Sequence, residues 1–210
     1  MRKIHKDKMP NSIVEYLSEN KMDLYRDLDE NGRRLIRNKL IIEQKSLCAY
    51  CCCRITINSS RNSHLKSQRD YPNKSLEWGN LVASCDYSRH CDKFQRVRSI
   101  PLTPLMESCE EDLVFTIAGR VEGKTDEAKE TIKILNLNEK SLVSMRKKAI
   151  LEFFDANQIQ PIDEYYLLDD EILEICIALS TEEDQDGNLI PFAPIFSRIM
   201  SDLLASRKTL

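Results

Sequence analysis

The sequence has few of the features that mark membrane, secreted or repetitive proteins. Its 210 residues include only five glycines and seven prolines, and we find no internal repeat. No stretch approaches the roughly 18 to 20 consecutive apolar residues that cross a bilayer. The N-terminus, MRKIHKDKMP, has basic residues but no apolar segment after them, so we expect no secretory signal. These absences predict a cytoplasmic protein that does not associate with a membrane.

Cysteine, in contrast, is abundant for a chain that is expected to stay reduced. Eight cysteines occur, and six of them lie between Cys48 and Cys91. Because the cytosol keeps thiols reduced, clustered cysteines indicate metal binding rather than disulfides. Cys109 and Cys176 stand apart among apolar neighbours, and we expect them to be ordinary buried thiols.

The clustered cysteines include two pairs that could share one metal ion. Cys48 and Cys51 form a C-x-x-C knuckle, and Cys85 and Cys91 form a second, wider pair. Structural Zn²⁺ sites take four tetrahedral ligands, often thiolates, so these four residues predict a closed zinc site. Cys52 is an alternative to Cys51, which we prefer because a two-residue gap is the commoner geometry.

Hydrophobic patterning predicts an α+β fold in which a small β segment is embedded in a mainly α-helical chain. Residues 10–45 have helical periodicity with an expected interruption at Asn31-Gly32. Residues 54–58 (RITIN) alternate and are β-branched, which favours a strand, and residues 59–62 resemble a turn. A second strand is expected around Asn80 and a short helix after Asp86. Further helices are expected at residues 126–135, 139–157, 169–179 and 195–205.

Charge is distributed unevenly along the chain, which we divide into residues 1–45, 46–98 and 99–210. Residues 54–98 contain nine Lys or Arg against four Asp or Glu, whereas residues 101–210 contain 11 against 22. A basic segment suits a polyanion such as nucleic acid. The acidic half would repel that polyanion, so we expect it to support the fold or to bind a partner protein.

The segments LCAYC, NSHLKSQRDYP, LEWGNLVASCD and RHCDKF resemble the HNH endonucleases of the PtuB-like group, which belong to retron-associated and Septu anti-phage systems. The motif match covers about residues 46–94, and the stretch DLVFTIAGRV…TIKILNLNEKSLVSMR also resembles that group. The resemblance implies a zinc-stabilised ββα-metal (HNH) motif at residues 46–98, preceded by a helical segment and followed by a helical region that docks a partner.

The resemblance also implies roles for single residues. His64 would be the general base, since a neutral imidazole can take a proton from water at pH 7. Asn80 would fix the loop and orient the His64 ring, and His90 would hold a catalytic divalent ion, most simply Mg²⁺, against the scissile phosphate. Candidate phosphate contacts are Lys66, Arg69, Lys74, Lys93 and Arg96.

Two features leave alternatives open within this assignment. In HNH enzymes the residue before the first histidine is often acidic and shares the metal, but here it is Ser63, for which Asp86 or Asp92 could compensate. His90 adjoins Cys91 and is also a candidate zinc ligand.

The resulting hypothesis is a metal-dependent endonuclease that serves as the toxic effector of a defence system. By resemblance its partners are a nucleic-acid substrate, a PtuA-like ATPase and, in retron systems, a reverse transcriptase with its RNA–DNA product. The alternative is a zinc-stabilised adaptor that binds nucleic acid or protein without catalysis. A redox protein is less favoured, because no βαβ pattern surrounds the C-x-x-C.

Overall fold

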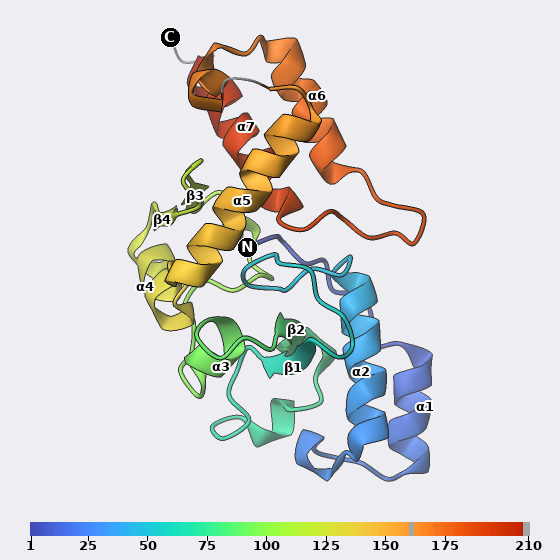
Figure 1. Ribbon diagram of the computed structural model, residues 1–210. Helices are drawn as coiled ribbons and strands as arrows, with labels where there is room; N and C mark the ends of the chain where they lie inside the picture. The colour runs from blue at the N-terminus through green and yellow to red at the C-terminus, as the bar shows by residue number, and fades with distance from the viewer. Residues whose placement is uncertain (160–161, 208–210) are drawn as a thin grey trace.

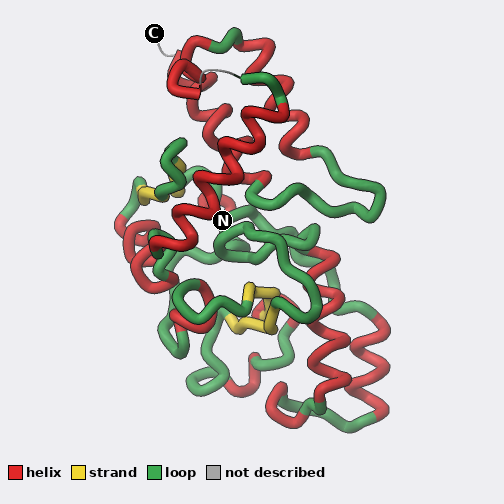
Figure 2. Tube along the Cα trace, viewed as in Figure 1, coloured by secondary structure: helices red, strands yellow, loops and turns green. Residues whose placement is uncertain are grey.

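The fold combines α-helices with two small antiparallel sheets, which confirms the α+β class (Figures 1 and 2). The computed structural model describes residues 1–159 and 162–207. Its helices are α1 (Asn11–Glu19), α2 (Glu30–Glu43), α3 (Cys91–Gln95), α4 (Asp126–Leu135), α5 (Lys140–Ala156), α6 (Asp170–Thr181) and α7 (Ala193–Arg207). Its strands are β1 (Ser60–His64), β2 (Leu81–Cys85), β3 (Leu113–Phe115) and β4 (Val121–Gly123).

Helices α1 and α2 form a packed pair at the N-terminal end of the chain (Figure 1). Asp29 caps α2, because its Oδ1 accepts a hydrogen bond from the Gly32 amide at 2.8 Å. The interruption expected at Asn31-Gly32 is therefore wrong, since Gly32 lies in the first turn of α2. A Cβ atom on Gly32 would come 2.7 Å from the Tyr16 ring, so glycine here permits the close approach of α1.

Strands β1 and β2 form the sheet at the centre of the motif region, between α2 and α3 (Figure 1). In their antiparallel register Ser60 faces Cys85 and His64 faces Leu81. A two-stranded sheet is marginal by itself, and here the Gln44 side chain, which follows α2, supports its outer edge. Gln44 donates to the Ala83 carbonyl at 2.9 Å and accepts from the Ala83 amide at 2.7 Å, which fixes the end of α2 against β2.

The first strand lies later in the chain than its sequence predicts. The segment 54–58 makes an isolated bridge between Leu47 and Arg54, so the strand expected there is wrong, and β1 instead begins at Ser60 in the expected turn. β1 has the polar sequence SRNSH, which lacks apolar alternation. The Nδ2 of its buried Asn62 donates to the Arg33 carbonyl at 2.9 Å and to the Tyr25 hydroxyl at 2.8 Å, so this strand is held by side-chain hydrogen bonds as well as by packing.

The helices of the C-terminal part agree with the sequence-based expectation for α4 to α7 within a few residues. The β3–β4 hairpin was not expected, and it precedes α4. The long helix α5 extends from α4 towards the α6–α7 pair (Figure 1). Phe153 of α5 stacks on Phe196 of α7 with ring centroids 4.6 Å apart, which joins the pair to the rest of the chain.

Buried apolar side chains from all three sequence segments form one continuous core cluster. The cluster includes the cysteines of the motif region, and Cys109 and Cys176 are also buried, as expected. Within residues 1–159 and 162–207, none of the helices has the length and apolar character that a bilayer crossing requires. The structure therefore positions the motif region as part of a shared core.

Candidate functional site

Four buried cysteines meet at the junction of α2, β2 and α3. The Sγ atoms of Cys48, Cys51, Cys85 and Cys91 all lie within 4.8 Å of one another. The Cys51–Cys85 separation is 3.8 Å and the Cys48–Cys91 separation is 3.9 Å. A tetrahedral site with Zn–S bonds of about 2.3 Å has S–S edges of about 3.8 Å. The four sulfur atoms can therefore hold a structural metal ion such as zinc.

Local backbone bonds fix the turn that carries the first cysteine pair. The Cys52 amide donates to the Cys48 carbonyl at 3.0 Å, and the Cys48 amide donates to the Cys53 carbonyl at 2.9 Å. The Cys85 amide donates to the Cys48 sulfur at 3.3 Å, which ties the turn to β2. The four-sulfur cluster contains Cys51 and not Cys52, as the two-residue spacing predicts.

The electrostatic environment of the cluster requires a compensating positive charge. Burial raises the pKa of Cys51 to about 12, so this thiol keeps its proton unless a metal cation replaces it. Four thiolates around Zn²⁺ carry a net charge of about −2. Arg146 of α5 is 1% exposed and forms no ion pair within the described chain. Burial lowers its pKa, while the charges of Cys51 and Cys91 act in the opposite direction.

His90 lies against the cysteine cluster. Its ring is fully buried, and its Nδ1 is 3.1 Å from the Cys91 sulfur and 3.8 Å from the Cys85 sulfur. The Tyr87 ring covers it with a centroid distance of 5.1 Å. The expectation that His90 faces a scissile phosphate is therefore not met, because solvent and substrate cannot reach the ring. The alternative, that His90 is itself a zinc ligand, is not met either, because the cluster consists of the four cysteines and His90 lies beside it.

A solvent-accessible pocket of about 530 Å³ opens on the other side of α3 and β1. It contains His64 together with one carboxylate and several cations, and it does not contain His90. Its lining residues are Arg61, Asn62, His64, Ser67, Gln68, Arg69, Asp92, Lys93, Arg96 and Val97.

His64 is held in this pocket in one defined tautomer. Its Nε2 lies 2.9 Å from the Ser75 carbonyl, which can only accept, so Nε2 carries the proton. The other nitrogen, Nδ1, then has a free lone pair that accepts from the Gln68 amide at 3.2 Å. Burial lowers the pKa of His64 below its ordinary value of 6.5. The ring is therefore neutral at pH 7 and presents a basic nitrogen towards an exposed side chain.

Asn80 fixes the loop that forms one wall of the pocket. Its Oδ1 accepts from the Lys66 amide at 2.7 Å, and its Nδ2 donates to the Lys74 carbonyl at 2.9 Å and to the Lys66 carbonyl at 3.2 Å. The expected loop-fixing role of Asn80 agrees with these contacts. The expected contact between Asn80 and the His64 ring is not made, because Ser75 and Gln68 orient that ring.

Asp92 supplies the carboxylate of the pocket. It is the second residue of α3, and its Oδ1 accepts from the Ser63 hydroxyl at 2.6 Å. Its Oδ2 forms an ion pair with Arg61 at 2.9 Å. Arg61 and Ser63 are two residues apart in β1 and so share a face of the strand. Arg61 was missed from sequence, and the period of β1 would have revealed it had that strand been recognised.

The cations expected to contact phosphate fall into two groups. Lys74 pairs with Glu77 at 3.8 Å, and Lys66 lies outside the pocket with its Nζ 5.6 Å from the centre of the Tyr71 ring. The other three expected cations, Arg69, Lys93 and Arg96, line the pocket. Arg61, which was not expected, lines it as well.

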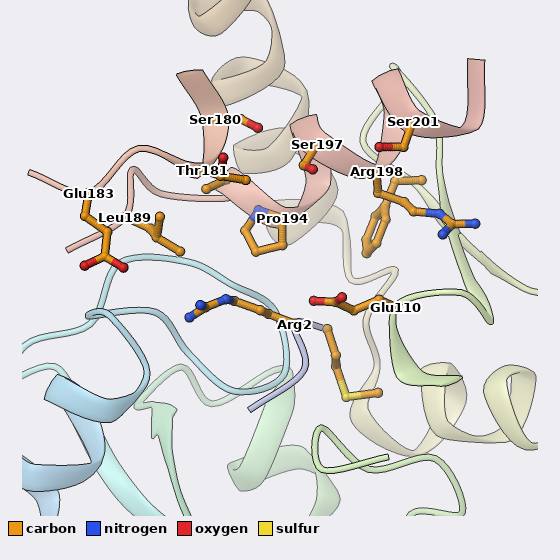
Figure 3. A pocket seen from close by; sticks show the side chains of 13 residues that line it. Arg2, Glu110, Ser180, Thr181, Glu183, Leu189, Pro194, Ser197, Arg198 and Ser201 are labelled. Atoms are coloured by element: carbon orange, nitrogen blue, oxygen red, sulfur yellow. The ribbon is translucent and has the colours of Figure 1, made fainter. Parts of the chain in front are cut away.

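A second cavity, of about 270 Å³, lies between the N-terminus, α6 and α7 (Figure 3). Arg2 and Glu110 point into it from one side, and Ser197 and Arg198 line the other (Figure 3). It contains none of the residues singled out from the sequence. Arg198 is already paired with Asp202 at 2.6 Å, and Glu183 with Lys45 at 2.9 Å.

A scan against protein-family models and a search of curated proteins found no match to this chain. The assignment of chemistry to the site therefore depends on its geometry and on the sequence motifs.

The cluster predicts that the purified protein carries about one tightly bound zinc ion per chain. Replacement of Cys85 by serine should remove that ion and lower the melting temperature, because structural zinc contributes folding free energy directly. Elemental analysis and thermal melting measure both effects. Cys176→Ser is the matched control, since Cys176 is a buried thiol on α6 outside the cluster, and it should keep the zinc. Loss of zinc from neither variant, or from both, would contradict this site.

The position of His90 predicts that it supports the metal site. Its Nδ1 can donate to the Cys91 sulfur, and loss of such an outer partner typically lowers metal affinity about 10- to 100-fold. His90→Leu should therefore bind zinc more weakly, as measured by competition with a chromogenic chelator. His90→Asn keeps a donor near the Nδ1 position and should retain most of the affinity. Unchanged zinc affinity in the leucine variant would refute this role.

Proposed function

We propose that the protein is a metal-dependent endonuclease that hydrolyses phosphodiester bonds in the His64 pocket. The observation that carries the proposal is the fixed tautomer of His64, whose basic Nδ1 adjoins Gln68 in a pocket that also contains Asp92 and several cations. This combination supplies a base, a metal-binding carboxylate and phosphate-binding groups. The ββα-metal arrangement of HNH enzymes is the finer fold assignment that we propose for β1, β2 and α3.

His64 would act as the general base. The Ser75 carbonyl holds the Nε2 proton, so only Nδ1 can accept a proton from water. Gln68 is exposed and its contact with Nδ1 is long at 3.2 Å, so a water molecule can take its place. The lowered pKa of His64 keeps the ring unprotonated at neutral pH, as a base requires.

Asp92 would provide the carboxylate that the position of Ser63 lacks. Its Oδ1 lies 2.6 Å from the Ser63 hydroxyl, so the acidic group stands beside the residue that precedes the base. Mg²⁺ is commonly held by one or two carboxylates together with water and substrate phosphates. Asp92 fits that pattern as the one carboxylate of the pocket. Among the described residues, the four cysteines are the only cluster of three or more metal-binding side chains, so a catalytic ion would depend on Asp92, water and the substrate.

The proposed reaction is a displacement at phosphorus. His64 Nδ1 takes a proton from water as the water oxygen forms a bond to phosphorus, and the bond to the 3′ oxygen breaks. The leaving 3′ oxygen takes a proton from solvent water, and His64 returns its proton to solvent. A divalent ion bound at Asp92 would supply Lewis-acid stabilisation of the developing negative charge. Arg69 and Arg96 would bind neighbouring phosphates of the strand and so position the scissile one.

We further propose that this nuclease is the effector of an anti-phage defence system. The sequence resemblance to the PtuB-like group supports this step, and so does the segregation of charge between the basic motif and the acidic C-terminal half. A PtuA-like ATPase would dock on the acidic helical region, with a reverse transcriptase and its RNA–DNA product in a retron system. The second candidate, a non-catalytic adaptor, is favoured by Ser63 and by the engagement of Asp92 with Arg61.

The proposed roles predict the effects of two substitutions on cleavage. His64→Ala should lower the rate of DNA or RNA cleavage by at least about 100-fold, because it removes the general base. Asp92→Asn should raise the Mg²⁺ or Mn²⁺ concentration needed for cleavage, because it removes a metal-binding charge. Cleavage of plasmid DNA, single-stranded DNA and RNA, with and without EDTA, measures both.

His5→Ala is the matched control, because His5 is exposed and lies outside the pocket. It should cleave at the wild-type rate. Substrate that binds but stays intact under every condition, also with a co-purified ATPase, would favour the adaptor. Cleavage that survives His64→Ala would exclude His64 as the base.

The pKa of His64 predicts a specific pH profile. Because burial lowers that pKa below 6.5, the reactive neutral ring predominates at pH 7 and is lost only as the pH falls through the lowered value. The cleavage rate should therefore be flat around neutrality and decline below pH 6.5, while zinc content stays constant. A decline centred above pH 6.5 would contradict the assignment of His64 as the base.

A further inference from the structure

The proposed active-site pocket continues into a second hollow across the end of α3. This hollow, of about 430 Å³, is lined by Ser88, Phe94 and Arg98 together with three residues of the first pocket. The shared residues are Lys93, Arg96 and Val97. The two hollows therefore adjoin each other at these three residues, and we refer to them together as the groove.

Two arginines of this groove have charge available for a ligand. Arg69 and Arg96 form no ion pair within residues 1–159 and 162–207, whereas Lys93 is paired with Asp86 at 2.9 Å. Arg96 also has φ +58° and ψ −117°, a conformation that favours glycine. A non-glycine residue held in such a conformation costs free energy, so replacement of Arg96 by glycine should relieve the backbone.

One exposed aromatic ring lines the groove, and a second lies in the loop whose residues Ser67 to Arg69 form a wall of the first pocket. Phe94 lines the second hollow with 36% of its surface exposed, and Tyr71 is 46% exposed in the loop that Asn80 fixes. Each ring already has a cation over it: Arg98 lies 5.2 Å from the Phe94 centroid, and Lys66 lies 5.6 Å from the Tyr71 centroid. Large exposed aromatic side chains next to unpaired cations are typical of surfaces that bind single-stranded nucleic acid.

We infer that the groove binds an unpaired nucleic-acid strand, with bases stacked on Phe94 and Tyr71 and phosphates on Arg69 and Arg96. This inference rests on the proposed nuclease function and specifies its substrate class. In a duplex the base faces are covered by neighbouring base pairs, so exposed rings gain nothing from it beyond the contact to the backbone. In an unpaired strand every base offers a face that can stack on an aromatic ring.

The inference predicts that the aromatic residues matter only for the unpaired strand. In the His64→Ala background, which binds without cutting, Phe94→Ala or Tyr71→Ala should weaken binding of a fluorescent single-stranded oligonucleotide about 5- to 100-fold. Binding of the same sequence as a blunt duplex should change less than about 2-fold. Phe94→Trp and Tyr71→Phe keep a ring and should retain the affinity.

Two further variants separate stacking from charge and from folding. Arg96→Gly should weaken binding of both strands and duplex, because it removes a phosphate contact, yet melt at a higher temperature, because it relieves the backbone. Ile175→Ala changes an exposed apolar residue of α6 outside the groove and should bind like its parent. Zinc content and melting temperature verify the folding of each variant.

The outcomes distinguish this inference from the nuclease proposal. Binding of the unpaired strand that requires Phe94, in a protein that never cleaves, would sustain the inference and refute the nuclease. Cleavage that depends on His64, combined with equal losses for strand and duplex or with no loss in Phe94→Ala and Tyr71→Ala, would sustain the nuclease and refute the inference.

Discussion

The convergence of four sulfur atoms is the constraint on which the motif region depends. Cys48 and Cys51 follow α2, Cys85 ends β2, and Cys91 begins α3, so one bound ion would join the end of α2 to two elements of five residues each. The sheet between them has two strands, and α3 has five residues, which is too little structure to be stable alone. The cluster connects α3 to β2, and β2 pairs with β1. On this frame Asp92 of α3 accepts a hydrogen bond from Ser63 of β1, so a bound ion would support the geometry of the proposed active site.

The sequence predicted the cysteine cluster better than it predicted the arrangement of the proposed catalytic residues. Cysteine pairs carry their chemistry in residue type, so Cys48, Cys51, Cys85 and Cys91 could be selected from spacing alone. The direction in which a side chain points at the start of a short helix could not be predicted in this way. Cys91 has φ +59°, and this turn directs His90 into the cysteine cluster. The residue after Cys91, and not the one before it, therefore faces the pocket.

The fold was predicted well where its elements depend on local sequence signals, and poorly where they depend on contacts between residues distant in sequence. Helices α4 to α7 have clear periodicity and caps, such as Thr125, which accepts from the Ala128 amide, and they were predicted closely. β1 has no apolar alternation, and its buried polar side chains form hydrogen bonds to partners distant in sequence, such as Tyr50 with Ser63. The RITIN segment has the right composition for a strand but pairs only through Arg54 with Leu47.

The pairing of Asp92 with Arg61 has a consequence for how the proposed nuclease would assemble its site. As long as Arg61 neutralises the carboxylate, Asp92 attracts a divalent cation weakly. A substrate phosphate competes for the same guanidinium, since arginine binds phosphate and carboxylate through the same fork of donors. Phosphate binding to Arg61 would release the negative charge of Asp92 next to the phosphate, where a divalent ion is needed. Substrate and catalytic ion would then bind cooperatively, so the hydrolytic site would be complete only when nucleic acid occupies the groove.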